Sequence, residues 1–146
     1  MREVTYRPCK QGHLGLILPQ EHDKKLLPAY MSPAFKTVLE NSFGISAWVG
    51  CKPIGAAGVI PMHGECALAW SMLGGDAGPY LLQITRKVRE ALDILPYKRV
   101  EMRVLYDFEE GHRWARLLGF GEPEASRMRK SGIRGEDETL YAKIKE

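Results

Sequence analysis

Two groups able to exchange protons stand two residues apart in a turn near the middle of the chain, the imidazole of His63 and the carboxylate of Glu65. An imidazole titrates near neutral pH and a suitably placed carboxylate accepts a proton, so either could act as a general base. The alternative for Glu65 is an exposed carboxylate at the start of a strand. Two tyrosines at element ends, Tyr80 and Tyr106, could act as acids, although such rings more often serve in packing.

The cysteines suggest no chemistry of their own. His63 and Cys66 have the spacing of metal ligands, but no second pair lies nearby, so we expect no metal site. Cys9, Cys51 and Cys66 are too few and too scattered for a disulfide framework, and no His and Asn constellation marks one of them as a nucleophile. Buried free thiols are therefore expected.

A glycine-rich segment, residues 74–78, connects a predicted strand to the most strongly patterned helix of the chain. That helix has an apolar face formed by Leu81, Leu82, Ile84, Val88, Ala91, Leu92 and Leu95. The opposite face carries Arg86, Lys87, Arg89 and Glu90. A flexible strand-to-helix connection is the simplest interpretation of the glycines.

The elements that position these groups follow from residue patterning. Alternation and turn signals predict strands at residues 3–8, 45–49, 54–60, 65–73, 100–106, 124–129 and 139–144. Helical spacing predicts helices at residues 33–43, 81–95 and 109–118, and the stretch 12–28 is ambiguous but compatible with a helix. Ser32 caps the first of these helices ahead of Pro33, and Gly119 stands where a helix C-cap belongs. Turns are expected at residues 50–53 and 61–64.

This order of elements predicts an α/β (α+β) fold. We expect one domain over residues 1–146, with a mixed, mostly antiparallel central sheet of six to seven strands and helices on both faces. The length of 146 residues suits one ordinary domain. No internal repeat interrupts the chain.

The composition excludes several classes of protein. No apolar run approaches the roughly 20 residues that span a bilayer, and the N-terminus lacks the apolar core of a secretory signal, so we expect a cytoplasmic protein. The formal charge of +3 fits an anionic ligand better than a dedicated nucleic-acid binder. The basic residues Arg127, Arg129, Lys130 and Arg134 lack interleaved aromatics, and a nucleic-acid module is the last-ranked function.

The segment Gly111-His-Arg-Trp-Ala-Arg-Leu-Leu-Gly-Phe120 resembles the helix that ends in Leu-Gly-Phe in the GNAT acetyltransferases. The order of elements, from Tyr6-Arg7-Pro8 to the closing strands, is similar to that superfamily over nearly the whole chain. The resemblance implies acetyl-CoA as co-substrate and transfer of the acetyl group to a primary amine, of a small molecule or a protein, by direct attack. A narrower similarity, carried by the His-Arg-Trp helix and the Leu140-Tyr141 strand, is to GNAT-type proteins of tailed phages, some of them internal virion proteins.

In the family, the fourth strand leads into a loop of pattern Gln/Arg-x-x-Gly-x-Gly/Ala, whose N–H groups bind the CoA pyrophosphate. The resemblance places the CoA site at Met72, Leu73, Gly74, Gly75, Asp76, Ala77, Gly78, Pro79 and Tyr80. Leu73, or Met72 in a shifted alignment, replaces the Gln or Arg, and Asp76 replaces the first glycine and would repel a phosphate. The basic residues at 86, 87 and 89 could assist the phosphates, but a solvated helix face explains them equally.

The resemblance also implies catalytic roles. Glu65 opens the fourth strand, where many family members have the general base, and His63 is the second candidate. The family's tyrosine acid is replaced here by Ala115, so Tyr106 or Tyr80 is the substitute. These departures support a second hypothesis, a catalytically degenerate domain that binds protein or forms part of a virion. Under either hypothesis the protein acts in a cytoplasm or, if phage-encoded, in the host or virion, and the late strands could pair across a homodimer.

Overall fold

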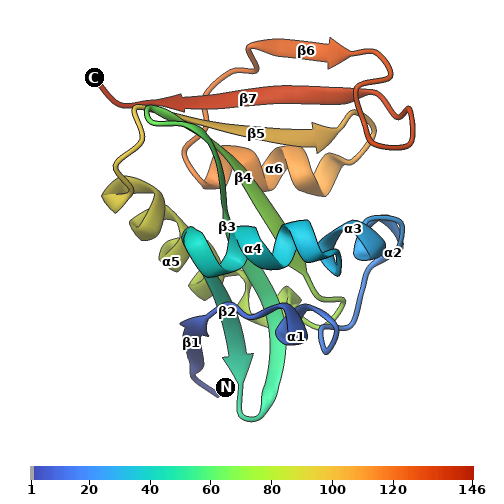
Figure 1. The fold of residues 1–146 in the computed structure, drawn as a ribbon, viewed down its shortest axis with the longest axis vertical. Coiled ribbons are helices and arrows are strands. Elements are labelled where there is room, and N and C mark those ends of the chain that lie inside the picture. Colours follow the sequence, from blue (N-terminus) through green and yellow to red (C-terminus); the bar gives the residue numbers. More distant parts are fainter. Residues whose placement is uncertain (1) are drawn as a thin grey trace. The chain divides into compact units, whose positions relative to one another are not determined.

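The computed structural model describes residues 2–146 (Figure 1). Seven strands form one sheet: β1 (Val4–Pro8), β2 (Gly44–Val49), β3 (Lys52–His63), β4 (Cys66–Leu73), β5 (Arg99–Leu105), β6 (Ala125–Met128) and β7 (Glu138–Ile144). The helices are α1 (Gln11–Leu14), α2 (Glu21–Lys24), α3 (Leu27–Tyr30), α4 (Pro33–Asn41), the 3₁₀ turn η1 (Gly78–Tyr80), α5 (Leu81–Ile94) and α6 (Glu109–Leu117).

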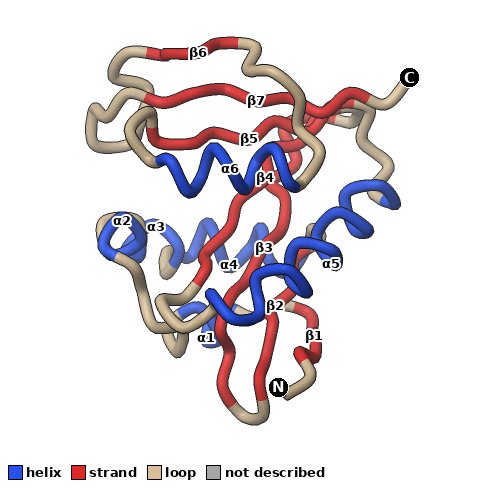
Figure 2. The backbone as a smooth tube through the Cα atoms, turned by 180° about the vertical axis from the view of Figure 1, so that it is seen from behind, coloured by secondary structure: helices blue, strands red, loops and turns tan. Residues whose placement is uncertain are grey.

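The strand order in the sheet is β1-β2-β3-β4-β5-β7-β6. Neighbouring strands run antiparallel in the pairs β1–β2, β2–β3, β5–β7 and β6–β7, whereas β4 and β5 are parallel. Figure 2 shows the same strands in red with the helices in blue. The predicted mixed, mostly antiparallel sheet with flanking helices is confirmed.

The chain forms two compact units. The first comprises the residues up to Ile60 together with Trp70–Ile84, and the second comprises Pro61–Ala69 and Thr85–Glu146. Strands β3 and β4 and helix α5 each contribute residues to both units.

The first unit has a core of apolar side chains from its short helices and strands. Buried residues of this core are Cys9, Leu14, Ile17, Phe35, Ala56, Trp70 and Met72. The Ser32 hydroxyl accepts a hydrogen bond from the Phe35 N–H at 3.2 Å, as expected for an N-cap, and α4 begins at Pro33. The ambiguous stretch 12–28 forms parts of three helices of four residues each, too short for a periodic pattern to show in the sequence.

The second unit is built on the packing of α6 against β5, which lie side by side in Figure 1. A Cβ atom at Gly111 would meet the Phe108 ring at 2.6 Å and Val104 Cγ1 at 2.7 Å, so only glycine allows this close approach. The Trp114 indole N–H donates to Thr85 Oγ1 at 2.9 Å, and Trp114 is buried. Gly119, directly after the C-cap residue Leu118, has φ +95°, a conformation that favours glycine.

Two local predictions are wrong. Residues Pro61–His63 belong to β3, so the turn before β4 consists of Gly64 and Glu65 alone. A tight two-residue turn suffices to reverse a long hairpin. Proline is tolerated in a strand at a position where the ladder does not require its N–H, so Pro61 did not have to end β3. Cys51 is exposed in the turn between β2 and β3, whereas Cys9 and Cys66 are buried as free thiols. Within residues 2–146, no helix is long and apolar enough to cross a membrane.

Candidate functional site

The loop from Leu73 to Tyr80, which joins β4 to α5, lies wholly in the first unit and is held by backbone hydrogen bonds. The N–H of Gly74 donates to the Ile54 carbonyl at 2.8 Å, that of Gly75 to Leu18 at 2.9 Å and that of Ala77 to Gly74 at 3.1 Å. These three N–H groups therefore stabilise the loop and are already paired with backbone carbonyls. Met72, which precedes it, is fully buried in the core and contributes packing.

The glycines of this loop differ in what surrounds them. A Cβ atom at Gly74 would meet Asp76 Oδ1 and the Ile54 carbonyl, both at 2.8 Å, so close packing demands glycine there. A Cβ atom at Gly78 would meet nothing within 4 Å. Gly78 opens the turn η1 at the N-terminal side of α5, where a helix presents partial positive charge. The open end of the loop is thus at Gly78.

Asp76 does not leave an uncompensated negative charge in the loop. One carboxylate oxygen, Oδ2, lies 2.7 Å from Nζ of Lys52, at the start of β3. The other, Oδ1, is buried without a hydrogen-bond partner among the described residues. Because Lys52 balances Asp76, the repulsion of a phosphate expected from the sequence is reduced.

The segment before α2 supports the loop. The Gln20 side chain donates from Nε2 to the Leu73 carbonyl at 2.7 Å. Sequence reasoning missed both Gln20 and Lys52, because each lies far from the loop in the chain and no motif marks either. Of the basic residues on α5, Arg89 donates to the Leu117 carbonyl at 3.0 Å and so stabilises the second unit.

The two candidate bases lie together in the second unit. Glu65 has a side chain that is 63% exposed, 3.7 Å from Lys98 Nζ. Its N–H donates to Nδ1 of His63 at 3.3 Å, and its carbonyl accepts the N–H of Arg99 at 3.0 Å. Glu65 therefore lies in the turn before β4, beside the start of β5, with most of its side chain accessible to a substrate or to water.

Tyr106, also in the second unit, follows the opposite end of β5. Its ring stacks under the Arg127 guanidinium at 4.4 Å. Tyr106 lies seven positions after Arg99, whose N–H bonds the Glu65 carbonyl, and at ~3.3 Å per position this stretch spans about 23 Å. Glu65 and Tyr106 consequently cannot act together on one thioester.

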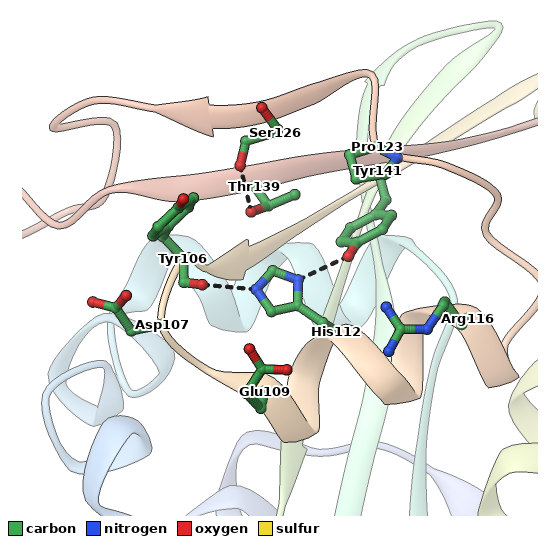
Figure 3. A pocket seen from close by; sticks show the side chains of 9 residues that line it. All are labelled: Tyr106, Asp107, Glu109, His112, Arg116, Pro123, Ser126, Thr139 and Tyr141. Carbon is green, nitrogen blue, oxygen red and sulfur yellow. Dashed lines mark hydrogen bonds between the residues drawn. The ribbon is translucent and has the colours of Figure 1, made fainter.

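A cavity of about 400 Å³ lies beside Tyr106, lined by residues of α6, β6, β7 and the end of β5 (Figure 3). At its centre His112 Nε2 lies 2.9 Å from the Tyr106 carbonyl and Nδ1 lies 2.8 Å from the Tyr141 hydroxyl. A carbonyl can only accept, so the neutral imidazole donates from Nε2 and accepts the Tyr141 hydroxyl proton at Nδ1. Both ring nitrogens are satisfied, and His112 connects three elements of the second unit.

Ala115, in the position of the family's tyrosine acid, is fully buried. Its carbonyl accepts the Phe120 N–H at 3.1 Å, within the packed end of α6. No phenol stands at this position, and the described residues contain no group of three or more His, Cys, Asp or Glu side chains that could hold a metal.

Comparison with known proteins gives matches among solved structures alone: no family model and no curated protein sequence matches the chain. The ribosomal-protein-S5-alanine acetyltransferase of Vibrio fischeri is 16% identical, with a TM-score of 0.70 over 99% of this chain and 94% of that one. A chimera of the spermidine N-acetyltransferase of Vibrio cholerae with a second enzyme is 15% identical, with a TM-score of 0.66 over 97% and 95% of the two chains.

The microcin C7 self-immunity acetyltransferase, solved with acetyl-CoA and AMP, is 14% identical, with a TM-score of 0.66 over 98% of this chain and 93% of that one. These neighbours match from end to end, so the likeness extends over both units. The chain has the fold of the GNAT acetyltransferases.

Proposed function

We propose that the protein is an N-acetyltransferase that transfers the acetyl group of acetyl-CoA to a primary amine. The observation that carries the proposal is the β4–α5 loop, which ends in open space at Gly78 and lies at the start of a helix, in a GNAT fold. Three of the solved neighbours support it by their names: two act on spermidine or a ribosomal protein alanine, and one holds acetyl-CoA.

In the proposed cofactor site, the CoA pyrophosphate lies at the Gly78 end of the loop, and Lys52 offsets the negative charge of Asp76 nearby. Gly74, Gly75 and Ala77 keep the loop in shape through their bonded N–H groups, so the phosphate would rely on the remaining N–H groups toward α5. Leu73, Pro79 and Tyr80 belong to the same proposed surface, and Met72 supports it from the core.

The proposed reaction is direct. The neutral amine nitrogen attacks the thioester carbonyl, the C–S bond of the tetrahedral intermediate breaks, and CoA leaves as a thiolate. Glu65, directly or through water, takes the proton of the attacking nitrogen, with His63 as the second candidate. Since Tyr106 lies at the other end of β5, solvent protonates the thiolate in this scheme.

A second candidate function has one specific observation in its favour. Ala115 stands buried where a tyrosine acid would be expected, which supports a domain that binds CoA or a protein partner without turnover, including a virion component. The acceptor is unidentified under either function, and a homodimer through the late strands remains part of the proposal.

Calorimetric titration with acetyl-CoA and with CoA, followed by an assay of thiol release with a panel of amines, separates the candidates. Binding with thiol release supports the acetyltransferase, and binding without release supports the degenerate domain. Absence of binding at millimolar acetyl-CoA would reject both cofactor-based proposals.

A further inference from the structure

The second unit contains a cavity that the proposed transfer reaction does not use. Its volume of about 400 Å³ lies within the roughly 300–1,000 Å³ of small-molecule sites. The lining includes Tyr141, which is only 2% exposed, and side chains from α6, β6, β7 and the end of β5 (Figure 3). The cavity is therefore large enough for a small organic molecule.

Charged side chains of both signs line this cavity. Asp107 precedes α6 and Glu109 begins it, whereas Arg116 lies near its end. All three side chains are exposed, and none forms a hydrogen bond or an ion pair with another of residues 2–146. In Figure 3, Asp107 and Arg116 lie on opposite sides of the His112 ring. The lining is thus negative at one end and positive at the other.

The geometry of α6 sets the distance between these opposite charges. Glu109, His112 and Arg116 follow one another at three and four residues, so they share one face of the helix. The seven positions from Glu109 to Arg116 rise ~10.5 Å along the helix axis. An ion contact takes up about 2.8 Å at each end, which leaves about 5 Å between the charges of a ligand that meets both side chains.

The two opposite charges act on the same buried hydroxyl. Burial raises the pKa of Tyr141, the charge of Arg116 lowers it, and the charges of Glu122 and Glu109 raise it. Arg116 and Glu109 are therefore both close enough to the Tyr141 oxygen to affect its ionisation.

Hydroxyl groups of the lining offer acceptors beside the carboxylates. The Tyr141 hydroxyl donates to His112 Nδ1 at 2.8 Å, and the Thr139 hydroxyl donates to the Ser126 carbonyl at 2.8 Å. Each of these oxygens has given its proton away and keeps lone pairs. An ammonium group has three N–H donors, so it gains from such acceptors as well as from a carboxylate.

We propose that this cavity binds a small zwitterion whose ammonium group lies toward Asp107 and Glu109 and whose carboxylate lies on Arg116. The spacing of about 5 Å is that of a γ-amino acid. A cation alone would be repelled by Arg116 and an anion alone by the two carboxylates, so the lining favours a molecule with both charges. The planar guanidinium matches a carboxylate with two parallel hydrogen bonds. The site goes beyond the proposed acetyl transfer and does not depend on it.

The first test titrates 4-aminobutanoate into the isotope-labelled protein and follows the backbone N–H signals by NMR. Its charges lie about 5 Å apart across four bonds, whereas those of glycine lie about 2.5 Å apart. Butanoate and 1-aminobutane keep one charge each. We expect 4-aminobutanoate to bind about tenfold or more tightly than each of the other three, the scale of one charge contact. Equal affinity for 4-aminobutanoate and any of the three overturns the proposal.

The second test removes each end of the site. Arg116→Gln and the double variant Asp107→Asn/Glu109→Gln should each weaken 4-aminobutanoate binding about tenfold or more. These side chains are exposed and without partners among residues 2–146, so the fold is retained. Arg113→Gln and Glu110→Gln are the matched controls, because they change the same charges at exposed positions of α6 that do not line the cavity. Their affinity stays at the wild-type value.

Single-charge ligands distinguish contact in the cavity from a general effect of net charge. In Arg116→Gln, butanoate should bind more weakly and 1-aminobutane at least as well as in the wild type. A loss of 4-aminobutanoate affinity in Arg113→Gln equal to that in Arg116→Gln overturns the proposal. The titrations need no acetyl-CoA, so absence of 4-aminobutanoate binding at millimolar ligand overturns this site and leaves the acetyltransferase proposal standing.

Discussion

At the scale of single residues, the two outer glycines of the β4–α5 loop have different tasks. Gly74 is required by contacts with Asp76 and the Ile54 carbonyl, whereas Gly78 faces open space. A motif read from sequence treats them as equivalent glycines of one phosphate loop. The structure assigns packing to the first and leaves the second free to approach a ligand.

Replacing Gly78 with glutamate places a carboxylate in the open space where the phosphate is proposed. We expect acetyl-CoA affinity to fall about tenfold or more by repulsion, with an unfolding midpoint close to that of the wild type, since no atom lies in the way. Calorimetry and thermal melting measure the two quantities. Gly121→Glu, at another exposed glycine with nothing within 4 Å, is the control, and equal CoA affinity in both variants would remove Gly78 from the site.

Lys52 and Asp76 form a coupled pair in the same loop. Lys52→Ala leaves the Asp76 carboxylate without its cation and should weaken CoA binding, because the phosphates then meet an unbalanced negative charge. Asp76→Asn introduced into Lys52→Ala should recover part of the affinity. Calorimetric titration of Lys52→Ala, Asp76→Asn and the double variant gives the coupling free energy between the two residues in CoA binding. Additive effects of the two substitutions would contradict a shared role in binding CoA.

Glu65 is tested by a change that removes its basicity and keeps its shape. Glu65→Gln should lower kcat by about 10²-fold or more with CoA affinity unchanged, as for loss of a general base, and the loss should shrink at high pH where more amine is already neutral. The exposed pair with Lys98 contributes little to stability, so the fold is retained. Wild-type turnover in Glu65→Gln would leave His63 as the candidate.

At the scale of elements, the second unit depends on close contact between α6 and β5. His112 reinforces this contact by joining the Tyr106 carbonyl to the Tyr141 hydroxyl of β7. The consequence for function is indirect: these bonds hold the end of β5 in place, and with it the position of Tyr106.

Gly111→Ala tests that contact. Its Cβ atom would overlap Phe108 and Val104 below 3 Å, so α6 must move off β5. We expect a loss of about 1–3 kcal/mol in the free energy of unfolding, as for overpacked cores. Denaturant titration measures it, with Gly121→Ala as the control; a loss in the control equal to that in Gly111→Ala would show that helix docking is not the cause.

At the scale of the whole molecule, two carboxylates that pair with arginines make the stability depend on pH. Glu124 accepts two hydrogen bonds from Arg99, which lower its pKa, and Asp137 has its pKa lowered by the Lys130 N–H and then by Arg127. A lowered pKa in the folded state stabilises the protein above the unfolded-state values of 4.5 and 3.8, and this stabilisation is lost as the pH falls through and below them. Burial raises the pKa of Asp23, so protonation of this carboxyl at lower pH favours the folded state, which is the opposite effect.

The unfolding midpoint should therefore fall as the pH is lowered from about 5 to 3, the range below the carboxylates' ordinary pKa values. In Glu124→Gln/Asp137→Asn the fall should be shallower, since both groups no longer titrate. Thermal melts across this range provide the measurement. An identical slope in the double variant would mean that other carboxylates control acid unfolding.

Most of the fold could be predicted from local sequence. Ser32-Pro33 and Gly119 mark helix ends through interactions within a few residues, and both were located correctly. The predicted apolar face of α5 is buried at Ile84, Val88 and Leu92, but Leu82 is 64% exposed, so its assignment to that face was wrong. The helices between residues 11 and 30 could not be predicted, because four-residue helices are stabilised by tertiary contacts such as those of Leu14 and Tyr30.

The sequence by itself determined the order of elements, the sheet class and the glycine-rich connection between β4 and α5, because periodicity and glycine placement act locally. Only the tertiary structure decided that Lys52 balances Asp76, that Gly74 packs while Gly78 is open, and that Glu65 and Tyr106 stand at opposite ends of β5. Each of these depends on residues distant in the chain. The charge balance of an ion pair, the packing around a glycine and the distance between two side chains depend on positions in space, which a local sequence pattern does not encode.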